Sequence, residues 1–221
     1  EGTAEDAGHF SGRAAKLSPA DKVKVFYDAG FRAMEFNEYG ELPVEEQEAV
    51  ARQMEKLGMQ MGVFAPRVGS WEVPNLTGNI LDPKSRIRDK EGVERMVRSI
   101  MESALEVGKR AGVKWFTVVI GAEAPSLEYG YQFSNAVEHL KYAADFLEKN
   151  DGPIMVLESL NIKNHPGLWL KKIPQAYAVC KAVGSPKCKI LNDLYHQQVT
   201  EGNLIENIDA AWYENAYFQS A

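Results

Sequence analysis

The sequence contains few of the features that mark secreted, membrane or nucleotide-binding proteins. It has only two cysteines, Cys180 and Cys188, and we expect both to be reduced structural thiols rather than a disulfide. No apolar run is long enough to span a membrane, and no signal peptide is recognisable. No glycine-rich phosphate loop follows a predicted strand, which disfavours a nucleotide-binding doubly wound fold.

Clusters of basic residues are also missing. Lys and Arg number 25 against 31 Asp and Glu, giving a formal net charge of −6, so we expect neither nucleic acid nor a membrane as a partner. Hydrophobic residues at 45% and charged residues at 25% are ordinary for a globular domain. These properties leave both the cytoplasm and the periplasm open as locations.

What the chain does contain is an alternation of strand and helix patterns. Short apolar runs alternate with segments of helical spacing at intervals of about 30 residues, which predicts a parallel sheet with right-handed crossovers. The expected strands are 7–10, 31–36, 59–64, 115–120, 153–158, 188–193 and 215–218. The expected helices are 18–30, 43–58, 92–110, 133–147, 173–182 and 203–212.

This alternation predicts one α/β domain over residues 1–221. Continuous apolar strands flanked by helices suit either a doubly wound sheet or a (β/α)8 TIM barrel, and the missing glycine-rich loop favours the barrel. The seven expected strands make it a barrel truncated after the seventh strand. An open barrel would expose sheet edges, so a homo-oligomer is expected. The long polar connection 65–90 is typical of a lid or substrate loop.

Two of the expected strands end in an acidic residue, Glu158 and Asp193. Burying a lone carboxylate costs several kcal/mol, so each must face water, a cation or a basic partner. Neighbouring parallel strands lie about 4.8 Å apart and ligands bind at their carboxyl ends, so both carboxylates can reach one ion. Oxygen donors suit Mg²⁺ or Mn²⁺, and one imidazole is compatible with Mn²⁺. A salt-bridged strand end is the alternative.

His196 lies three residues after Asp193, and two arrangements are open. If the chain stays extended, the two side chains point apart; if it turns helical, they share a face. A hydrogen-bonded role outside any site is a further alternative. Glu35 is either a polar residue of the barrel interior or part of a structural pair. Structural or surface roles are expected for the other histidines: His9, His139 and His165.

Several ordered motifs resemble the hydroxypyruvate isomerase-like branch of the xylose isomerase-like TIM barrels. Upstream, Gly30-Phe-Arg-Ala-Met-Glu-Phe-Asn37 and Met61-Gly-Val-Phe64 are similar to it. The more specific motifs are Val156-Leu-Glu158-Ser-Leu-Asn161, His165-Pro-Gly167, Ile190-Leu-Asn-Asp193-Leu-Tyr-His196-Gln-Gln198 and Ala216-Tyr-Phe-Gln219. The resemblance covers essentially the whole chain and implies a single barrel of the xylose isomerase-like type.

The resemblance also implies a role for each matching residue. Glu158 would be a metal ligand and one of two acid–base carboxylates, and Asp193 and Gln219 would be metal ligands. His196 and Asn161 would bind the substrate. The family's second catalytic carboxylate is a glutamate on the eighth strand, and it has no counterpart in these 221 residues.

The activity implied is a Mg²⁺- or Mn²⁺-dependent isomerisation in carbohydrate metabolism, acting on hydroxypyruvate or a small sugar through an enediolate. Two alternatives stay open. One is a truncated, non-catalytic barrel that binds a ligand or a partner. The other is a phosphodiesterase of the endonuclease branch, although that branch uses more histidines. The segment 214–220 also resembles a protease-cleavable tag with alanine in place of leucine, and on that interpretation Gln219 is no ligand.

Overall fold

The computed structural model describes residues 16–66, 71–85 and 87–220, and its elements follow the predicted alternation. The helices are α1 (Pro19–Asp28), α2 (Val44–Leu57), α3 (Asn75–Gly78), α4 (Lys90–Ala111), α5 (Tyr129–Lys149), α6 (Ile173–Val183), α7 (Leu194–Thr200) and α8 (Leu204–Ala210), with 3₁₀ turns η3 (Asn37–Glu41) and η4 (Trp212–Glu214). The strands are β1 (Ala33–Met34), β2 (Gln60–Met61), β3 (Val63–Phe64), β4 (Trp115–Val118), β5 (Ile154–Glu158), β6 (Cys188–Asp193) and β7 (Asn215–Gln219).

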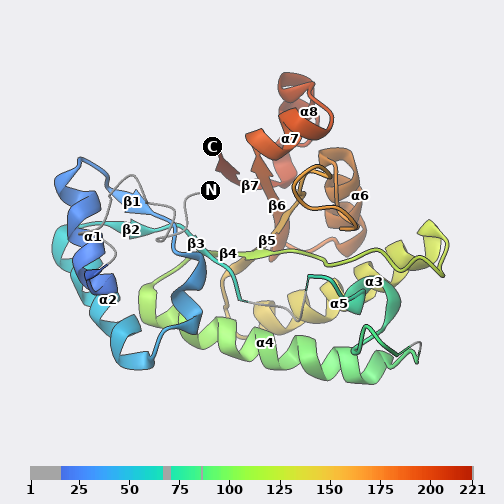
Figure 1. The fold of residues 1–221 in the computed structure, drawn as a ribbon, viewed down its shortest axis with the longest axis horizontal. Helices are drawn as coiled ribbons and strands as arrows, with labels where there is room; N and C mark the ends of the chain where they lie inside the picture. Colours follow the sequence, from blue (N-terminus) through green and yellow to red (C-terminus); the bar gives the residue numbers. More distant parts are fainter. Residues whose placement is uncertain (1–15, 67–70, 86, 221) are drawn as a thin grey trace.

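The strands lie side by side in chain order and run parallel. Strands β3 to β7 form one sheet of five, and β1 and β2 form a pair. Backbone bonds link the two sheets, because Gly62 donates to Met34 and Phe36 donates to Val63. The described strands thus form an open part of a barrel wall, as the sequence predicted (Figure 1).

The larger core lies between the sheet and the helices. Consecutive helices pack on one another, α1 on α2, α2 on α4, α4 on α5 and α5 on α6 (Figure 1). Helix α4 shows why the sequence folds this way, since its buried residues other than glycine recur every three or four positions. These residues are Val93, Val97, Met101, Ala104 and Val107. Asp89 caps the start of this helix by accepting from the Gly92 N–H at 2.8 Å, and Gly112 ends it in the left-handed conformation.

A smaller core fills the concave side of the sheet. It contains Val63, Val156 and Leu191, with Trp115 and Tyr217 packed against them. Successive side chains of a strand point to opposite faces, so the neighbours of these residues join the larger core instead. Burial on both faces explains the continuous apolar runs of the sequence. It also assigns the last residues of β5 and β6 to the concave side.

The structure departs from the sequence-based expectations mainly at the loops. The connection 65–90 contains the short helix α3, and helix α7 follows directly on β6. Strands β1, β2 and β3 are shorter than expected, since η3 begins at Asn37 and Gly62 interrupts the next run. The expected strand 7–10 lies outside the described residues. Both cysteines are buried and free, as expected.

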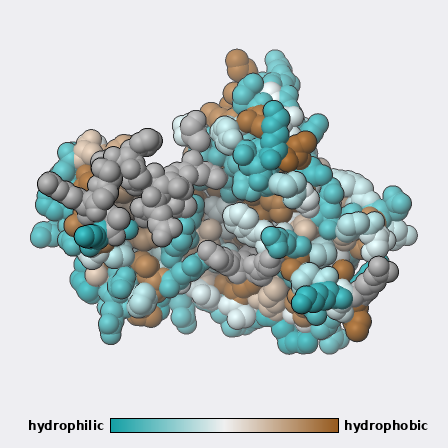
Figure 2. All heavy atoms as spheres, in the orientation of Figure 1, coloured by the Kyte–Doolittle hydropathy of each residue, from teal (hydrophilic) through white to brown (hydrophobic). Residues whose placement is uncertain are grey.

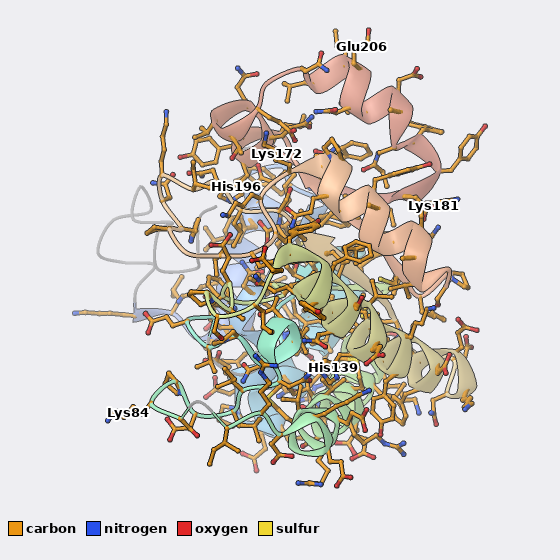
Figure 3. The ribbon with its side chains drawn as sticks, turned by 90° about the vertical axis from the view of Figure 1, so that its right-hand side faces the viewer. Lys84, His139, Lys172, Lys181, His196 and Glu206 are labelled. Carbon is orange, nitrogen blue, oxygen red and sulfur yellow. The ribbon has the colours of Figure 1, made fainter. Side chains whose placement is uncertain are left out.

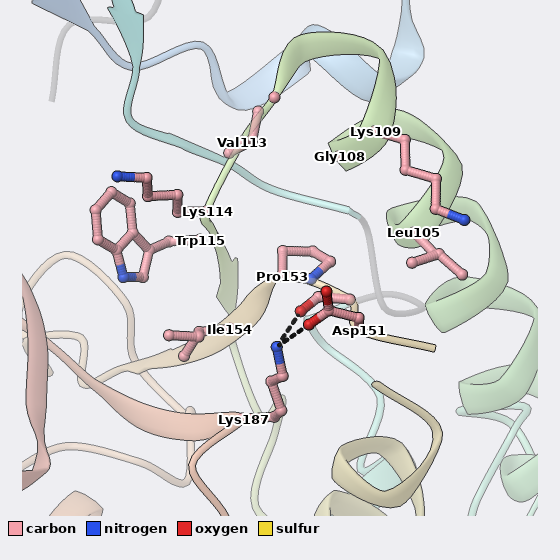
Figure 4. A pocket seen from close by; sticks show the side chains of 12 residues that line it. Leu105, Gly108, Lys109, Val113, Lys114, Trp115, Asp151, Pro153, Ile154 and Lys187 are labelled. Carbon is pink, nitrogen blue, oxygen red and sulfur yellow. Dashed lines mark hydrogen bonds and ion pairs between the residues drawn. The ribbon is translucent and has the colours of Figure 1, made fainter. Parts of the chain in front are cut away.

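The surface and the far end of the sheet carry little that points to chemistry. Among the described residues, no helix has the length and apolar character needed to cross a membrane. Hydrophilic residues predominate on the face shown in Figure 2. A pocket of about 380 Å³ lies at the amino-terminal ends of β4 and β5, where Lys187 pairs with Asp151 at 3.7 Å (Figure 4). Ligands of parallel sheets bind at the opposite ends of the strands.

Candidate metal and substrate site

Glu158 and Asp193 are the last residues of the neighbouring strands β5 and β6. Alternation along each strand places Glu158 on the same face as Val156, and Asp193 on the same face as Leu191. Both carboxylates therefore lie on the concave side, at the carboxyl ends of the strands. Glu158 is only 6% exposed and Asp193 only 1%, so bulk water solvates neither carboxylate. The sequence correctly predicted that they would be neighbours.

Asp193 also starts the helix that positions His196. Its Oδ1 atom accepts from the backbone N–H of Tyr195 at 2.7 Å and of His196 at 3.1 Å, which caps α7. The chain therefore turns helical after the strand, which settles the arrangement that the sequence left open. His196 Nε2 consequently lies 3.7 Å from Glu158 Oε1 and 3.9 Å from Asp193 Oδ2. These three residues form the described group of His, Cys, Asp and Glu side chains that could hold a metal ion.

Asn161 determines which nitrogen of His196 faces the carboxylates. The Oδ1 atom of Asn161 accepts from two backbone N–H groups of the following loop, at 3.1 and 2.9 Å, so its Nδ2 atom is the one directed at His196. That Nδ2 lies 2.7 Å from His196 Nδ1, and the Asn161 backbone N–H also donates to Nδ1 at 3.3 Å. Because Nδ1 accepts both bonds, the proton of the neutral ring is assigned to Nε2.

This assignment gives the three residues of the group different chemistry. An Nε2–H is a hydrogen-bond donor and not a metal ligand, so His196 presents a donor beside two carboxylates. The described hydrogen bonds of Asn161 are all made to other residues of the protein, and two of them orient the His196 ring. Its predicted direct contact with a substrate stays a prediction.

The oxygen atoms around this group suit a hard divalent cation. Asp193 Oδ2 is buried and accepts no hydrogen bond from the described residues, which is costly for a carboxylate oxygen without a cation. Gln219 pairs in register with Asp193, so both side chains lie on the concave face. Its Oε1 atom is also buried without a described hydrogen bond. Carboxylate and amide oxygens are the donors that Mg²⁺ and Mn²⁺ prefer.

A pocket of about 370 Å³ lies beside these residues. Its lining comes from the loops after β3, β4 and β5, and includes Trp71, Glu72, Ala122, Asn164, His165 and Leu168. The His165 ring lies 5.4 Å from the His196 ring and 6.3 Å from the Trp71 ring, measured between centroids. The pocket therefore adjoins the Glu158, Asp193 and His196 group through the contact between His165 and His196.

The other described histidines lie in different surroundings. His165 lines the pocket, in the loop that follows the strand ending in Glu158, and its structural or surface role stays a prediction. His139 is buried away from the site, with Nε2 2.6 Å from Asn79 Oδ1 (Figure 3). Its burial lowers its pKa, so it is a neutral core residue. His9 lies outside the described residues.

Comparisons with known proteins agree with this fold. A family model described as "Xylose isomerase-like TIM barrel" matches residues 23–219. The chain is 26% identical to the 2-oxo-tetronate isomerase of Cupriavidus necator, over 86% of this chain and 71% of that protein. It is 30% identical to the hydroxypyruvate isomerase of Escherichia coli, over 51% of this chain and 43% of that protein.

Solved structures show the same fold at lower sequence identity. An AP endonuclease, family 2, from Brucella melitensis matches 91% of this chain and 73% of its own, with a TM-score of 0.72 and 21% identity. A D-psicose 3-epimerase crystallised in the presence of D-fructose matches 93% of this chain and 68% of its own, with a TM-score of 0.66 and 16% identity.

Proposed function

This chain belongs to the xylose isomerase-like TIM barrel family, and on that premise we propose that it is a divalent-metal-dependent isomerase of small sugars or hydroxy-keto acids. The observation that carries this proposal is the pair of buried carboxylates, Glu158 and Asp193, at the carboxyl ends of β5 and β6, with His196 Nε2 beside both. Two relatives named as isomerases, of hydroxypyruvate and of 2-oxo-tetronate, support the reaction class.

Glu158, Asp193 and Gln219 would hold the cation through their oxygen atoms. Bound Mg²⁺ or Mn²⁺ would polarise the substrate carbonyl and stabilise the negative charge that forms on its oxygen. The buried position of Glu158 and Asp193 keeps bulk water away, which strengthens charge interactions within the site.

Proton movement is then the task of the side chains. Interconversion of an aldose and a ketose removes a proton from the carbon next to the carbonyl and returns one to the former carbonyl carbon. Glu158 would take that proton and would return it to the former carbonyl carbon, since the second carboxylate of the family has no counterpart in these residues. His196 would donate its Nε2–H to a substrate oxygen, in the orientation that Asn161 imposes. The pocket beside His165 would receive the remaining carbons of the substrate.

The phosphodiesterase alternative has weaker support. A site of that type uses several histidines at more than one metal, whereas the described group of Glu158, Asp193 and His196 contains a single histidine, whose Nε2 is assigned as a hydrogen-bond donor. The similarity to an AP endonuclease structure is at 21% identity and shows the fold alone.

The test is isomerisation of hydroxypyruvate, 2-oxo-tetronate and small ketoses by the purified chain, followed by NMR with Mn²⁺, with Mg²⁺ and with EDTA. We expect metal-dependent turnover that falls at least about 100-fold in Glu158→Gln, the range for loss of a general base. Glu206→Gln serves as a matched control, because Glu206 is exposed on α8, far from His196 (Figure 3). Unchanged turnover in Glu158→Gln would refute the assignment.

A further inference from the structure

Glu35, directly after β1, contacts two side chains of β7 across the concave side of the sheet. Gln219 donates from Nε2 to Glu35 Oε2 at 2.8 Å. Tyr217, two residues earlier on the same strand, is also hydrogen-bonded to the Glu35 side chain. A carboxylate only accepts hydrogen bonds, so the Tyr217 hydroxyl is the donor. Glu35 therefore joins the first and last described strands.

The backbone opposite this contact is shaped to admit it. A Cβ atom on Gly62 would collide with the Tyr217 hydroxyl and would lie 3.2 Å from Glu35 Cγ, so a side chain at position 62 would displace both groups. The Tyr217 ring also packs edge-on against Trp115, with 5.6 Å between centroids. Tyr217 is thus held in place from two sides and in turn restrains the Glu35 carboxylate.

The bond to Glu35 selects one orientation of the Gln219 amide. A carboxylate only accepts hydrogen bonds, so it attracts the NH₂ group of an amide and repels its oxygen. With Nε2 directed at Glu35, Oε1 is the atom left to face elsewhere, and it is buried without a described hydrogen bond. Asp193 is the register partner of Gln219 on β6, so this oxygen lies on the same face as the Asp193 carboxylate.

We propose that Glu35 is a positioning residue that holds Gln219 with its carbonyl oxygen available to the cation bound by Glu158 and Asp193. This inference rests on the proposed function, because it assumes the metal site. Without the acceptor at position 35, the amide is free to rotate and present either NH₂ or oxygen. Groups that orient a metal ligand in this way typically contribute about 10- to 100-fold to metal affinity.

The test is titration of the full chain with Mn²⁺ by calorimetry, in single variants and in one double variant. We expect Glu35→Ala to weaken Mn²⁺ binding about 10- to 100-fold. Glu35→Gln should restore most of the affinity, because its amide oxygen still accepts from Gln219 although the negative charge is gone. In a Gln219→Ala background, Glu35→Ala should cause no further loss. A loss in Glu35→Gln as large as in Glu35→Ala would mean that charge alone matters, and would overturn the inference.

Asp193→Ala separates this inference from the function on which it rests. If Asp193→Ala leaves Mn²⁺ affinity unchanged, the metal site itself is wrong. If Asp193→Ala weakens binding while Glu35→Ala binds like the wild type, only the role of Glu35 is wrong. A loss caused by Glu35→Ala that persists with Gln219→Ala also overturns that role.

A measurement on the wild-type chain avoids any dependence on how the variants fold. Addition of Mg²⁺ should shift the side-chain carbonyl ¹³C resonance of Gln219, while its amide protons stay protected by the bond to Glu35. An unshifted carbon, or loss of that protection, would overturn the inference.

Discussion

Asn161 directs two nitrogen atoms at Nδ1 of His196, its side-chain Nδ2 at 2.7 Å and its backbone N at 3.3 Å. Both atoms belong to the residue three positions after Glu158, so the loop that follows β5 sets the position of the proton on the neighbouring imidazole. The geometry of β5 and the tautomer of His196 are thereby coupled, and the coupling can be tested.

Replacing Asn161 with aspartate should reverse the tautomer of His196. An oxygen facing Nδ1 accepts a hydrogen bond, so the ring proton moves to Nδ1. Nε2 can then no longer donate a hydrogen bond. We expect the isomerisation kcat to fall about 100-fold, within the range for loss of a proton donor. The ¹⁵N chemical shifts of the His196 ring report the tautomer directly. Asn207→Asp on α8 is the control, and a wild-type tautomer in Asn161→Asp would contradict the prediction.

Asp193 should contribute to stability through two separable interactions. Asp193→Asn keeps an oxygen that can cap α7 but loses the charge that attracts a cation, whereas Asp193→Ala loses both. We expect Asp193→Ala to lower the free energy of unfolding by about 1 kcal/mol without metal, and Asp193→Asn to lower it by less.

Added metal then isolates the second interaction. A ligand at 100 times its Kd stabilises the wild type by about 2.7 kcal/mol, and this gain should be largely lost in both variants. Urea unfolding with Mn²⁺ and with EDTA measures the difference. Equal stabilisation of all three proteins by Mn²⁺ would place the cation elsewhere.

His139 should make the protein less stable in mild acid. Burial lowers its pKa in the folded state, and the charge of Lys90 acts in the same direction, while Glu94 and Glu138 oppose it. The unfolded chain therefore binds a proton more readily, so stability is complete above the unfolded pKa of about 6.5 and is lost as the pH falls toward the lowered folded pKa. His139→Gln, which can still donate to Asn79, should flatten this dependence. Urea unfolding at pH 7.5 and 5.0 measures the free energy of unfolding of both proteins. An equal loss of stability between the two pH values in the wild type and in His139→Gln would contradict the prediction.

Gly62→Ala should destabilise the fold because its Cβ would collide with the Tyr217 hydroxyl. We expect a loss of about 1–3 kcal/mol, the usual cost of overpacking. Removing the hydroxyl as well, in Gly62→Ala with Tyr217→Phe, should recover part of that loss. Gly130→Ala is the matched control, since nothing lies within 4 Å of a Cβ at that position. Thermal unfolding of the four proteins distinguishes the collision from a general effect of glycine.

Much of the fold was predictable because its signals are local. Continuous apolar runs such as Ile154 to Leu157 are buried on both faces of the sheet. A strand needs apolar residues at every position only when the sheet lies between a helical layer and an inner core. Two of these runs end in a carboxylate, and the rule that ligands bind at the carboxyl ends of parallel strands predicted from the sequence that Glu158 and Asp193 lie together. The match to the family model and the similarity to a solved structure confirmed the predicted family and barrel fold.

The sequence by itself thus determined the order of elements, the family and the two carboxylates. Only the tertiary structure decided how their neighbours point. His196 Nε2 lies 3.7 Å from Glu158 Oε1 on a different element, and the Glu35–Gln219 bond joins residues 184 positions apart. Such contacts leave no periodic signal in the chain, because they arise from distances between elements that only packing brings together.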